Sequence, residues 1–455
     1  MKNLQWTICL VVILLLGGSC LKVQYRGDQV LKVIPQTKDH AYYLQTLSNK
    51  WLLDLWKPDM AEDISEGKEL HIRVPFSHVQ EMKQNLLQEK IPFEVLIKDV
   101  QKLIDASIVS EHAVSSRSLA SYDYTKYHPM HEIYQWMEQI KEEHSSLITK
   151  HYLGSTYEHR PIYYFKIGWP SDKTKKYIVI DCGIHAREWI AVAYCQWFIK
   201  EIISNQNDPL LNKVLKQVDF YVIPVLNVDG YIYSWTTERL WRKNRSPQNN
   251  GTCYGVDLNR NFNSAWCSTG ASRNCSSFTF CGLKAESELE TQALVSLVQG
   301  IKSNILSYLT IHSYGQYILL PYGYTTSPST NHKELTDVAE KAAAKLKEKH
   351  QTVYTVGSSS VILYNNSGSS ADWAADQKIR ISYTIELRDN GTYGFQLPPE
   401  QIKPTCEETM NAMMSIIEYL SDNYLENSAG IITSQWLNVF LSFAFLHLLL
   451  NNPLI

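Results

Sequence analysis

Tyr177-Ile-Val-Ile-Asp-Cys-Gly-Ile-His-Ala-Arg-Glu-Trp189 is the stretch that decides the fold of this chain. Its first half, residues 177–181, is almost continuously apolar, which is typical of a strand buried on both faces of a sheet. Its second half is polar and places His185 and Glu188 three residues apart, just before the helical pattern of residues 190–204. In open α/β sheets, functional side chains gather where strands end. We therefore expect a site at the end of this strand.

The same pattern recurs along residues 122–425, where apolar runs alternate with segments of helical spacing. Buried strands that alternate with helices predict an α/β fold with a mixed central sheet flanked by helices on both faces. The further strand-like runs are residues 220–224, 306–311 and 379–387, and the further helical segments are residues 131–144, 285–304, 334–350 and 406–420.

Residues 21–117 have a different pattern, which predicts a small α+β domain of ferredoxin-like type. A connecting helix over residues 99–111 is expected next, followed by a polar linker of small residues that contains a single Arg117. A lone basic residue in an exposed linker favours cutting by a trypsin-like protease. Such a cut would make residues 21–117 a removable prosegment. The alternative is a permanent accessory domain. Its strand-like runs are residues 30–34, 51–56, 69–74 and 93–97, and its helical segments are residues 39–48 and 76–89.

A zinc site is the first chemical expectation. His312 directly follows the apolar run 306–311, as His185 and Glu188 follow theirs. Two histidines and one glutamate are three zinc ligands, and they leave a fourth position open for water, as catalytic zinc requires. Alone, a His and a Glu three apart are common on surface helices. The second His beyond a buried strand favours one Zn²⁺ per chain.

An acid at the end of a third strand is the candidate general base. Glu386 interrupts the apolar run 379–387, and a buried acid is costly unless it is paired or used. Next to a zinc site it can take a proton from water and pass it to a leaving amine. The alternative is a structural ion pair between Glu386 and Arg388.

Basic residues complete the candidate site. Arg239-Leu-Trp-Arg242 and Val256-Asp-Leu-Asn-Arg-Asn261 lie in one long polar stretch. A planar guanidinium binds a carboxylate through two hydrogen bonds, and an amide such as Asn259 adds a neutral donor. A zinc hydrolase with arginines for a substrate carboxylate is expected to remove residues from peptide C-termini.

Both chain ends carry targeting patterns. Residues 1–20 combine Lys2, an apolar run and small residues, which is typical of a secretory signal peptide. Residues 429–455 begin with small residues and end in an apolar tail, which favours a glycosylphosphatidylinositol attachment signal over a tail-anchored helix. We therefore expect a protein on the extracellular face of the plasma membrane, held through a lipid anchor.

Composition and cysteine usage fit that location. The net charge of -3 argues against a nucleic-acid partner, because the chain has no excess of positive charge that would attract phosphates. Asn-X-Ser/Thr tripeptides favour a glycoprotein; among them are those that begin at Asn250, Asn274, Asn365 and Asn390. An even cluster of six cysteines predicts three disulfides, and six allow 15 pairings. These six are Cys182, Cys195, Cys253, Cys267, Cys275 and Cys281.

The quoted motifs resemble those of the pancreatic-type A/B metallocarboxypeptidases over residues 25–425. The matching segments are residues 185–189, 239–242, 257–261, 312–314, 363–364 and 385–389. The resemblance implies a carboxypeptidase-like fold, a catalytic domain over residues 118–428 and an inhibitory prosegment over residues 21–117. Peptide C-termini are the implied substrates, and we expect a monomer.

The resemblance also implies a role for each site residue. His185, Glu188 and His312 would bind zinc, Glu386 would be the base, and Arg242 would polarise the scissile carbonyl. The terminal carboxylate would lie against Asn259, Arg260 and Tyr364, and neighbouring subsites would be lined by Arg187, Tyr314 and Phe395. The implied disulfides are Cys182–Cys195, Cys253–Cys275 and Cys267–Cys281, with Cys406 free.

The specificity pocket departs from the charged types of that family. Segments near residues 356–370 and 404–410 look most like the O type, which has an Arg at the pocket floor for acidic side chains, whereas the B type has an Asp for Lys and Arg. This chain has Ala371 at that position. An unpaired charge in a buried pocket costs several kcal/mol, so we expect a preference for neutral or apolar C-terminal residues. Acidic preference and a non-catalytic peptide-binding relative are the alternatives.

Overall fold

The computed structural model describes residues 22–108 and 119–425 of the chain. The predicted signal peptide, Arg117 and the predicted anchor signal lie outside these residues. Within them, no helix combines the length and the apolar character needed to cross a bilayer.

The N-terminal part is a four-stranded antiparallel sheet with the strand order β2-β3-β1-β4. Alternate side chains of these strands and two helices share one apolar core, so the expected α+β domain is confirmed. Its elements are β1 (Gln29–Val33), α2 (Lys38–Trp51), β2 (Asp54–Lys57), β3 (Leu70–Val74), α3 (Phe76–Gln88) and β4 (Phe93–Ile97).

One boundary in this domain differs from the expectation. The run 51–56 was predicted as a single strand, but helix α2 continues through Trp51 and strand β2 begins only at Asp54. Leu52 has φ 52°, in the left-handed region, and the Leu53 N–H donates to the Ser48 carbonyl. This turn ends the helix without a glycine, so the apolar run gave no sign of the break.

The larger part contains an eight-stranded mixed sheet with the order β13-β12-β14-β11-β7-β8-β6-β5. β11 is parallel to both β14 and β7, and its nine residues are all buried, as the continuous apolar runs predicted. The strands are β5 (Ile148–Ser155), β6 (Pro161–Ile167), β7 (Lys176–Cys182), β8 (Val218–Ile223), β11 (Ile305–Ser313), β12 (Tyr317–Leu320), β13 (Thr355–Ser358) and β14 (Ile381–Leu387), with a separate small pair β9 (Pro247–Gln248) and β10 (Cys253–Tyr254).

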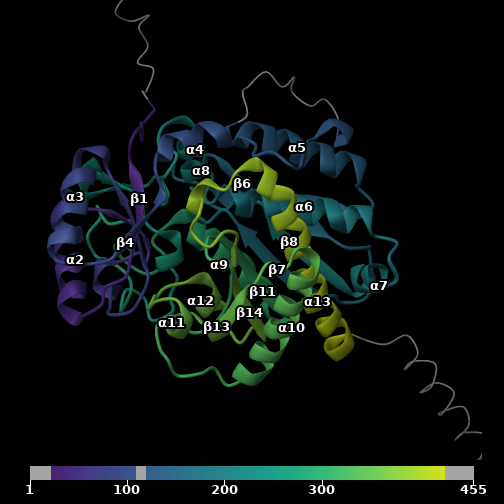
Figure 1. The fold of residues 1–455 in the computed structure, drawn as a ribbon. Helices are drawn as coiled ribbons and strands as arrows, with labels where there is room; N and C mark the ends of the chain where they lie inside the picture. Colours follow the sequence, from purple (N-terminus) through teal and green to yellow (C-terminus); the bar gives the residue numbers. More distant parts are fainter. Residues whose placement is uncertain (1–21, 109–118, 426–455) are drawn as a thin grey trace, which may run out of the picture.

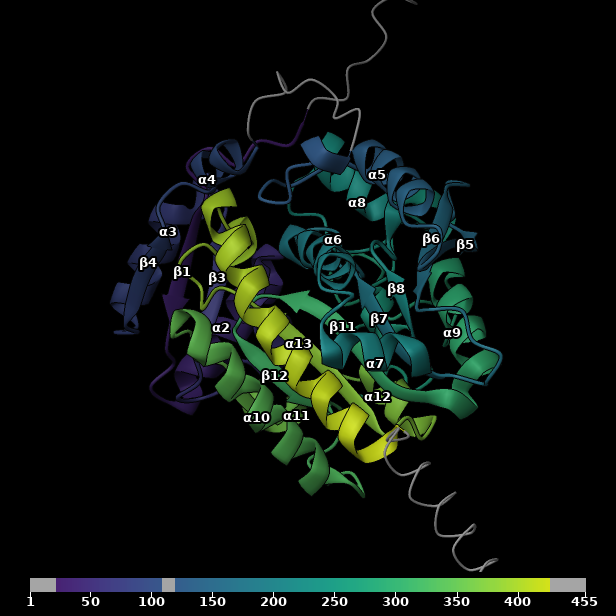
Figure 2. The same ribbon diagram turned by 90° about the vertical axis from the view of Figure 1, so that its right-hand side faces the viewer.

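Helices cover both faces of this sheet, which confirms the expected fold class (Figures 1 and 2). A disulfide joins Cys195 of α6 to Cys182 of β7. Helix α13 packs on α6 and α10, and helix α12 contacts β11 and β14. The helices are α5 (Met130–Glu143), α6 (Trp189–Ser204), α7 (Pro209–Gln217), α8 (Val228–Thr236), α9 (Leu289–Ile301), α10 (His332–His350), α11 (Ser359–Ile362), α12 (Ser370–Asp376) and α13 (Ile402–Tyr424).

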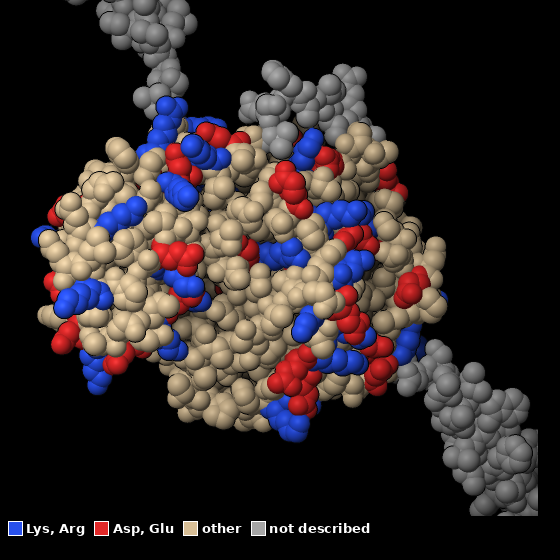
Figure 3. Space-filling model, viewed as in Figure 1, with Lys and Arg blue, Asp and Glu red and all other residues tan. Residues whose placement is uncertain are grey.

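The small domain lies beside the larger one and covers the carboxyl ends of its parallel strands. In Figure 1 it is the purple and blue part at the left, with the strands β7, β11 and β14 behind the yellow helix α13. Helix α4 (Val100–Ser107) leads away from it toward the linker. Acidic and basic side chains are interspersed on the face shown in Figure 3.

All three implied disulfides are confirmed: Cys182–Cys195, Cys253–Cys275 and Cys267–Cys281. Cys406 is free and buried. The two bridges among residues 253–281 fix a long irregular segment that includes the second part of the polar arginine stretch, residues 256–261.

Candidate functional site

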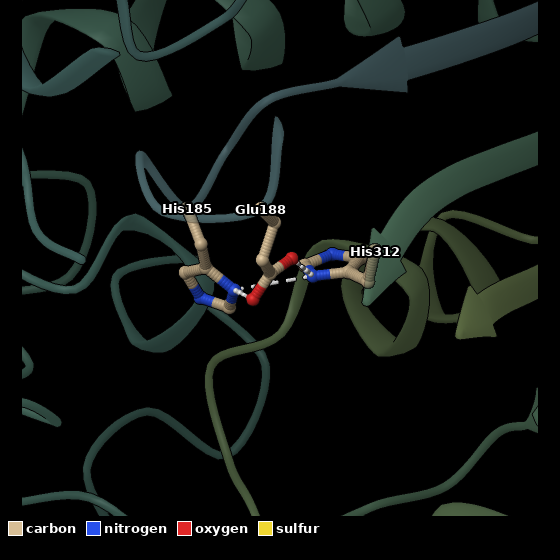
Figure 4. Close-up of side chains that lie close together, drawn as sticks. All are labelled: His185, Glu188 and His312. Carbon is tan, nitrogen blue, oxygen red and sulfur yellow. Dashed lines mark hydrogen bonds and ion pairs between the residues drawn. The ribbon is translucent and has the colours of Figure 1, made fainter. Parts of the chain in front are cut away.

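Two imidazoles and one carboxylate point at the same spot where strands β7 and β11 end (Figure 4). Glu188 Oε1 lies 2.7 Å from His185 Nδ1, and Glu188 Oε2 lies 3.1 Å from His312 Nδ1. The two Nδ1 atoms are 3.2 Å apart. Among the described residues this is the one group of at least three His, Cys, Asp or Glu residues placed to hold a metal ion.

The local backbone explains how these side chains meet. His185 and Glu188 lie in the short loop between β7 and α6, whose turn begins at Gly183 with φ +66°. Only glycine adopts this left-handed conformation without strain, and a Cβ there would lie 2.9 Å from the Val192 side chain. His312 is near the end of β11, which pairs in parallel with β7. Parallel pairing therefore brings both strand ends to one edge.

The ring nitrogens that face away from this spot are also held. His185 Nε2 lies 3.0 Å from Asp257 Oδ1, and His312 Nε2 lies 3.0 Å from Thr310 Oγ1. Both contacts leave the Nδ1 lone pairs free to bind a metal. Burial would raise the pKa of Glu188, but His185 and His312 outweigh it and hold that pKa well below its ordinary value. The donor set and its orientation fit Zn²⁺.

Glu386 stands directly beside the metal-ligand group, because β14 pairs with β11 so that Glu386 is opposite His312. Burial, reinforced by the nearby Glu188 charge, raises the pKa of Glu386 to about 8, and His312 and Arg242 oppose the shift. The alternative ion pair is not formed: Arg388 binds Glu408 instead. A buried acid with a raised pKa in a cleft is suited to proton transfer.

The arginines predicted from the polar stretch divide into two kinds. Arg242 and Arg260 line the cleft together with Asn259 and Tyr364. Arg239 lies outside it: its guanidinium donates to the carbonyls of Arg187 and Phe395 and stacks on Trp189, so it supports the wall.

Asp257 is a connecting residue that the motif contained but to which no role was given. It accepts from His185 Nε2 through one oxygen and from the Arg242 guanidinium through the other, at 2.8 Å from Nη2. His185 and Arg242 thus have fixed positions relative to each other. In the sequence, its signal was an acid within a motif of basic and amide residues; its complete burial is visible only in the structure.

Two carboxylates of the small domain occupy the arginine-lined cleft. Asp59 accepts from Arg260 Nη2 at 2.6 Å and from Arg242 Nη2 at 3.2 Å, and Asp54 accepts from Arg187 Nη1 at 3.1 Å. Neither acid was among the predicted site residues. The arginines that they bind in the cleft lie more than 130 positions later in the chain, so no local pattern predicts these contacts.

The remaining predicted subsite residues are also covered by the small domain. Tyr314 donates or accepts a hydrogen bond with His71 Nδ1 at 2.9 Å, and the Trp56 ring lies edge-on against Phe395. Arg187 lies over the Phe395 ring at 3.9 Å from its centre and is fully buried. In this form of the chain, these side chains are inaccessible to a peptide.

Small and polar side chains form the floor of the same cleft. Ala371 is buried, and its carbonyl accepts from the Ser382 hydroxyl. Asp372 next to it accepts from the Gly323 N–H at 2.9 Å, and burial raises its pKa to about 7. Ser359 and Ser369 also line this part. The charged arginine and aspartate side chains of the other types have no counterpart at position 371.

Two family models match the chain. The model of zinc carboxypeptidases matches residues 133–412, and the model of the carboxypeptidase activation peptide matches residues 31–107.

Individual relatives agree with these matches. Carboxypeptidase O of Bos taurus is 56% identical over 356 residues, which cover 78% of this chain and 94% of that protein. Carboxypeptidase B2 of Rattus norvegicus is 43% identical over 402 residues, covering 88% of this chain and 95% of that protein. The crystal structure of thrombin activatable fibrinolysis inhibitor superposes with a TM-score of 0.81 at 39% identity, over 88% of this chain and 100% of that one.

Proposed function

Since the chain belongs to the zinc carboxypeptidase family, we propose that it removes single residues from peptide C-termini and prefers neutral or apolar side chains. The observation that carries the proposal is the joint placement of His185, Glu188 and His312 beside Glu386 and two cleft arginines. A metal-ligand group, a base and a carboxylate-binding pair are the parts that C-terminal hydrolysis requires.

We assign the metal to His185, Glu188 and His312. When bound there, Zn²⁺ would polarise a substrate carbonyl and lower the pKa of water toward about 7. The far nitrogens of both histidines are already hydrogen-bonded, which fixes the tautomer in which Nδ1 binds the metal.

Glu386 is proposed as the proton carrier. Its carboxylate would take a proton from the attacking water and deliver it to the nitrogen of the leaving residue. Arg242 would donate to the scissile carbonyl oxygen as negative charge develops on it. Donors aimed at developing charge contribute most when they are held in place beforehand, and Asp257 holds Arg242 through two hydrogen bonds.

The terminal carboxylate of the substrate would lie between Arg260 and its neighbours Asn259 and Tyr364. Asp59 supports this assignment, because a carboxylate of the chain itself already binds the Arg260 and Arg242 guanidiniums. A substrate carboxylate has the same chemistry and would require this space. Arg187, Tyr314 and Phe395 would contact residues further from the terminus.

The preference for neutral side chains rests on Ala371. A methyl group at the floor provides no charge to pair with a substrate Glu or Lys, and the raised pKa of Asp372 favours its neutral form below about pH 7. An unpaired charge buried in such a pocket costs several kcal/mol. Acidic preference, as in the O type, is the competing proposal.

We also propose that residues 21–117 are a removable prosegment and that residues 118–428 form the catalytic domain. Asp54 and Asp59 would keep the cleft closed until a trypsin-like protease cuts near Arg117. Residues 1–20 would direct secretion, and residues 429–455 would be exchanged for a lipid anchor on the outer membrane face. Release of the protein from cells by a phosphatidylinositol-specific phospholipase tests the anchor.

A panel of peptides that differ in the C-terminal residue tests the function. Trypsin-treated protein should release Phe, Leu and other neutral residues, and a zinc chelator should abolish the release. Dominant release of Glu contradicts the pocket argument alone. No release from any peptide by zinc-loaded protein favours a non-catalytic peptide-binding relative.

A further inference from the structure

A buried hydrogen-bond chain runs from the candidate zinc ligand His312 back into the sheet. Thr310 precedes His312 by two residues on β11, so both side chains project from the same face of the strand. Asp181 is opposite Thr310 in the parallel pairing of β7 with β11. Register and alternation therefore place an imidazole, a hydroxyl and a carboxyl in one row.

The distances show that this row is connected. The Thr310 hydroxyl donates to Asp181 Oδ1 at 2.8 Å and lies 3.0 Å from His312 Nε2. Asp181 and Thr310 are both fully buried, and His312 is 1% exposed, so water does not compete for these contacts. Buried polar groups that lose a partner cannot replace it with solvent.

With Asp181 ionised, the hydroxyl can serve both neighbours in only one proton arrangement. It has one hydrogen, and that hydrogen is directed to Asp181. Its oxygen must then accept from His312, which requires the proton of the ring to be on Nε2. The Nδ1 lone pair is left facing Glu188 and His185, on the side where the metal would bind.

We infer that Thr310 and Asp181 are positioning residues for the zinc ligand His312, which they hold in the tautomer and ring orientation that metal binding needs. The inference rests on the zinc site proposed above. The two zinc ligands are then held in different ways. His312 is linked to the Asp181 carboxylate through the Thr310 hydroxyl, whereas His185 contacts the carboxylate of Asp257 directly. Neither Thr310 nor Asp181 would touch the metal or the substrate.

Neighbouring residues indicate that the hydrogen-bond chain is part of a larger buried polar group. The Tyr308 hydroxyl lies next to Asp181 and to Ser370, the first residue of α12. Ser370 in turn donates its N–H to Asn259 Oδ1 in the proposed carboxylate site.

Replacing the hydroxyl tests the inference on the full-length proenzyme. Thr310→Val keeps the size and β-branching of the side chain but removes the hydroxyl, whereas Thr310→Ser keeps the hydroxyl. The rate of zinc release to excess chelator is the readout. Removing a hydrogen-bond partner of a ligating histidine usually lowers metal affinity about 10- to 100-fold. We therefore expect zinc release about 10- to 100-fold faster from Thr310→Val, and a release rate close to wild type from Thr310→Ser.

Thr291→Val in α9 is the matched control, because Thr291 is also fully buried and lies outside the proposed site. It should release zinc at the wild-type rate. Thr310→Ala removes the same hydroxyl with less bulk and provides a second variant if Thr310→Val does not fold; thermal unfolding of the zinc-free proteins measures that loss separately. A wild-type release rate from either hydroxyl-free variant overturns the inference, as does equally fast release from Thr310→Ser. Wild-type protein without one zinc per chain contradicts the zinc site itself.

Discussion

Asp59 and Arg260 are separated by 201 positions in the sequence, yet the carboxylate and the guanidinium lie 2.6 Å apart in the arginine-lined cleft. Asp59 Oδ2 also accepts from Arg242. The contact joins the small domain to the two basic side chains that a substrate carboxylate would need. It gives the small domain a direct way to compete with a peptide end.

Asp59→Asn should therefore raise the activity of the uncut proenzyme. The amide keeps the size of the side chain but loses the charge, and breaking one partner of a buried ion pair costs about 3–5 kcal/mol. Part of that cost weakens the contact between the small domain and the cleft. Before trypsin treatment, Asp59→Asn should therefore hydrolyse peptides faster than wild type. After trypsin treatment, the two proteins should hydrolyse peptides equally fast.

The exposed acid Asp39 in helix α2 supplies the control. Asp39→Asn makes the same chemical change on the same domain and should leave the uncut proenzyme as inactive as wild type. Equal activity of the Asp59→Asn and wild-type proenzymes would show that this contact does not keep the cleft closed.

Glu386→Gln should abolish turnover while zinc content stays at one per chain. General acid–base catalysis typically contributes about 10²- to 10⁴-fold, and the amide cannot carry the proton. Glu340→Gln on the exposed side of α10 should be neutral. Loss of zinc together with activity would indicate that Glu386 holds the metal site together instead.

The pH profile gives the sign of the Glu386 effect. Its pKa is raised to about 8 in the metal-free chain, so the base is lost by protonation as pH falls. A bound cation favours the charged form and moves the pKa down. The acid limb of kcat/KM should therefore lie below pH 8 and fall about tenfold per pH unit. A profile that is flat down to pH 5 would exclude Glu386 as the base.

Zinc binding should release protons. Burial lowers the pKa of His312, but Glu188 outweighs it and the net pKa is raised above 6.5, so the metal-free imidazole keeps its proton to higher pH than usual. The metal binds only the neutral ring. Zinc affinity should accordingly fall as pH drops through that raised pKa. Calorimetry in buffers of different ionisation enthalpy measures the released protons, and no release near pH 7 contradicts the expectation.

The sequence was sufficient for features set by local patterns. Buried parallel strands such as β11 are continuous apolar runs, and the polar residues after them, His185 and His312, could be placed at one sheet edge by topology alone. The hairpin strands β5 and β6 were not predicted. In β5 (Ile148–Ser155), buried, half-buried and exposed side chains are mixed, so no apolar run marks it. In β6, the run 162–165 was a signal for a strand that the prediction did not use.

Contacts that depend on how two domains meet could not be predicted from the sequence. Asp54 interrupts the apolar run 51–56 and Asp59 lies in the polar segment after it, but their importance comes from the arginines that they face. Arg239 shows the opposite case: it shares a motif with Arg242, yet its guanidinium points into the wall of the cleft. Residue type and spacing were enough to predict which arginines belong to the site region. Which guanidiniums point into the cleft could be learned only from the three-dimensional structure.

Ala371→Asp should change the C-terminal preference toward Lys and Arg. A carboxylate at the pocket floor would pair with a cationic side chain, and a close buried charge pair contributes on the order of 1.5–7 kcal/mol in binding, so the ratio of Lys to Leu hydrolysis should rise at least about tenfold. Ala371→Asn supplies similar bulk without charge and should leave that ratio near wild type.

The pH dependence of this change follows from Asp372. Its pKa is already raised to about 7 by burial, so a second carboxyl beside it would also resist ionisation. A group with a raised pKa is neutral below that value and charged above it. The gain for Lys should therefore grow as pH rises from 6 to 8 and should be larger in Ala371→Asp than in Ala371→Asn, where Asp372 is the one carboxyl of the pair that can ionise. An equal gain in both variants at every pH would mean that pocket size, and not charge at position 371, sets the preference.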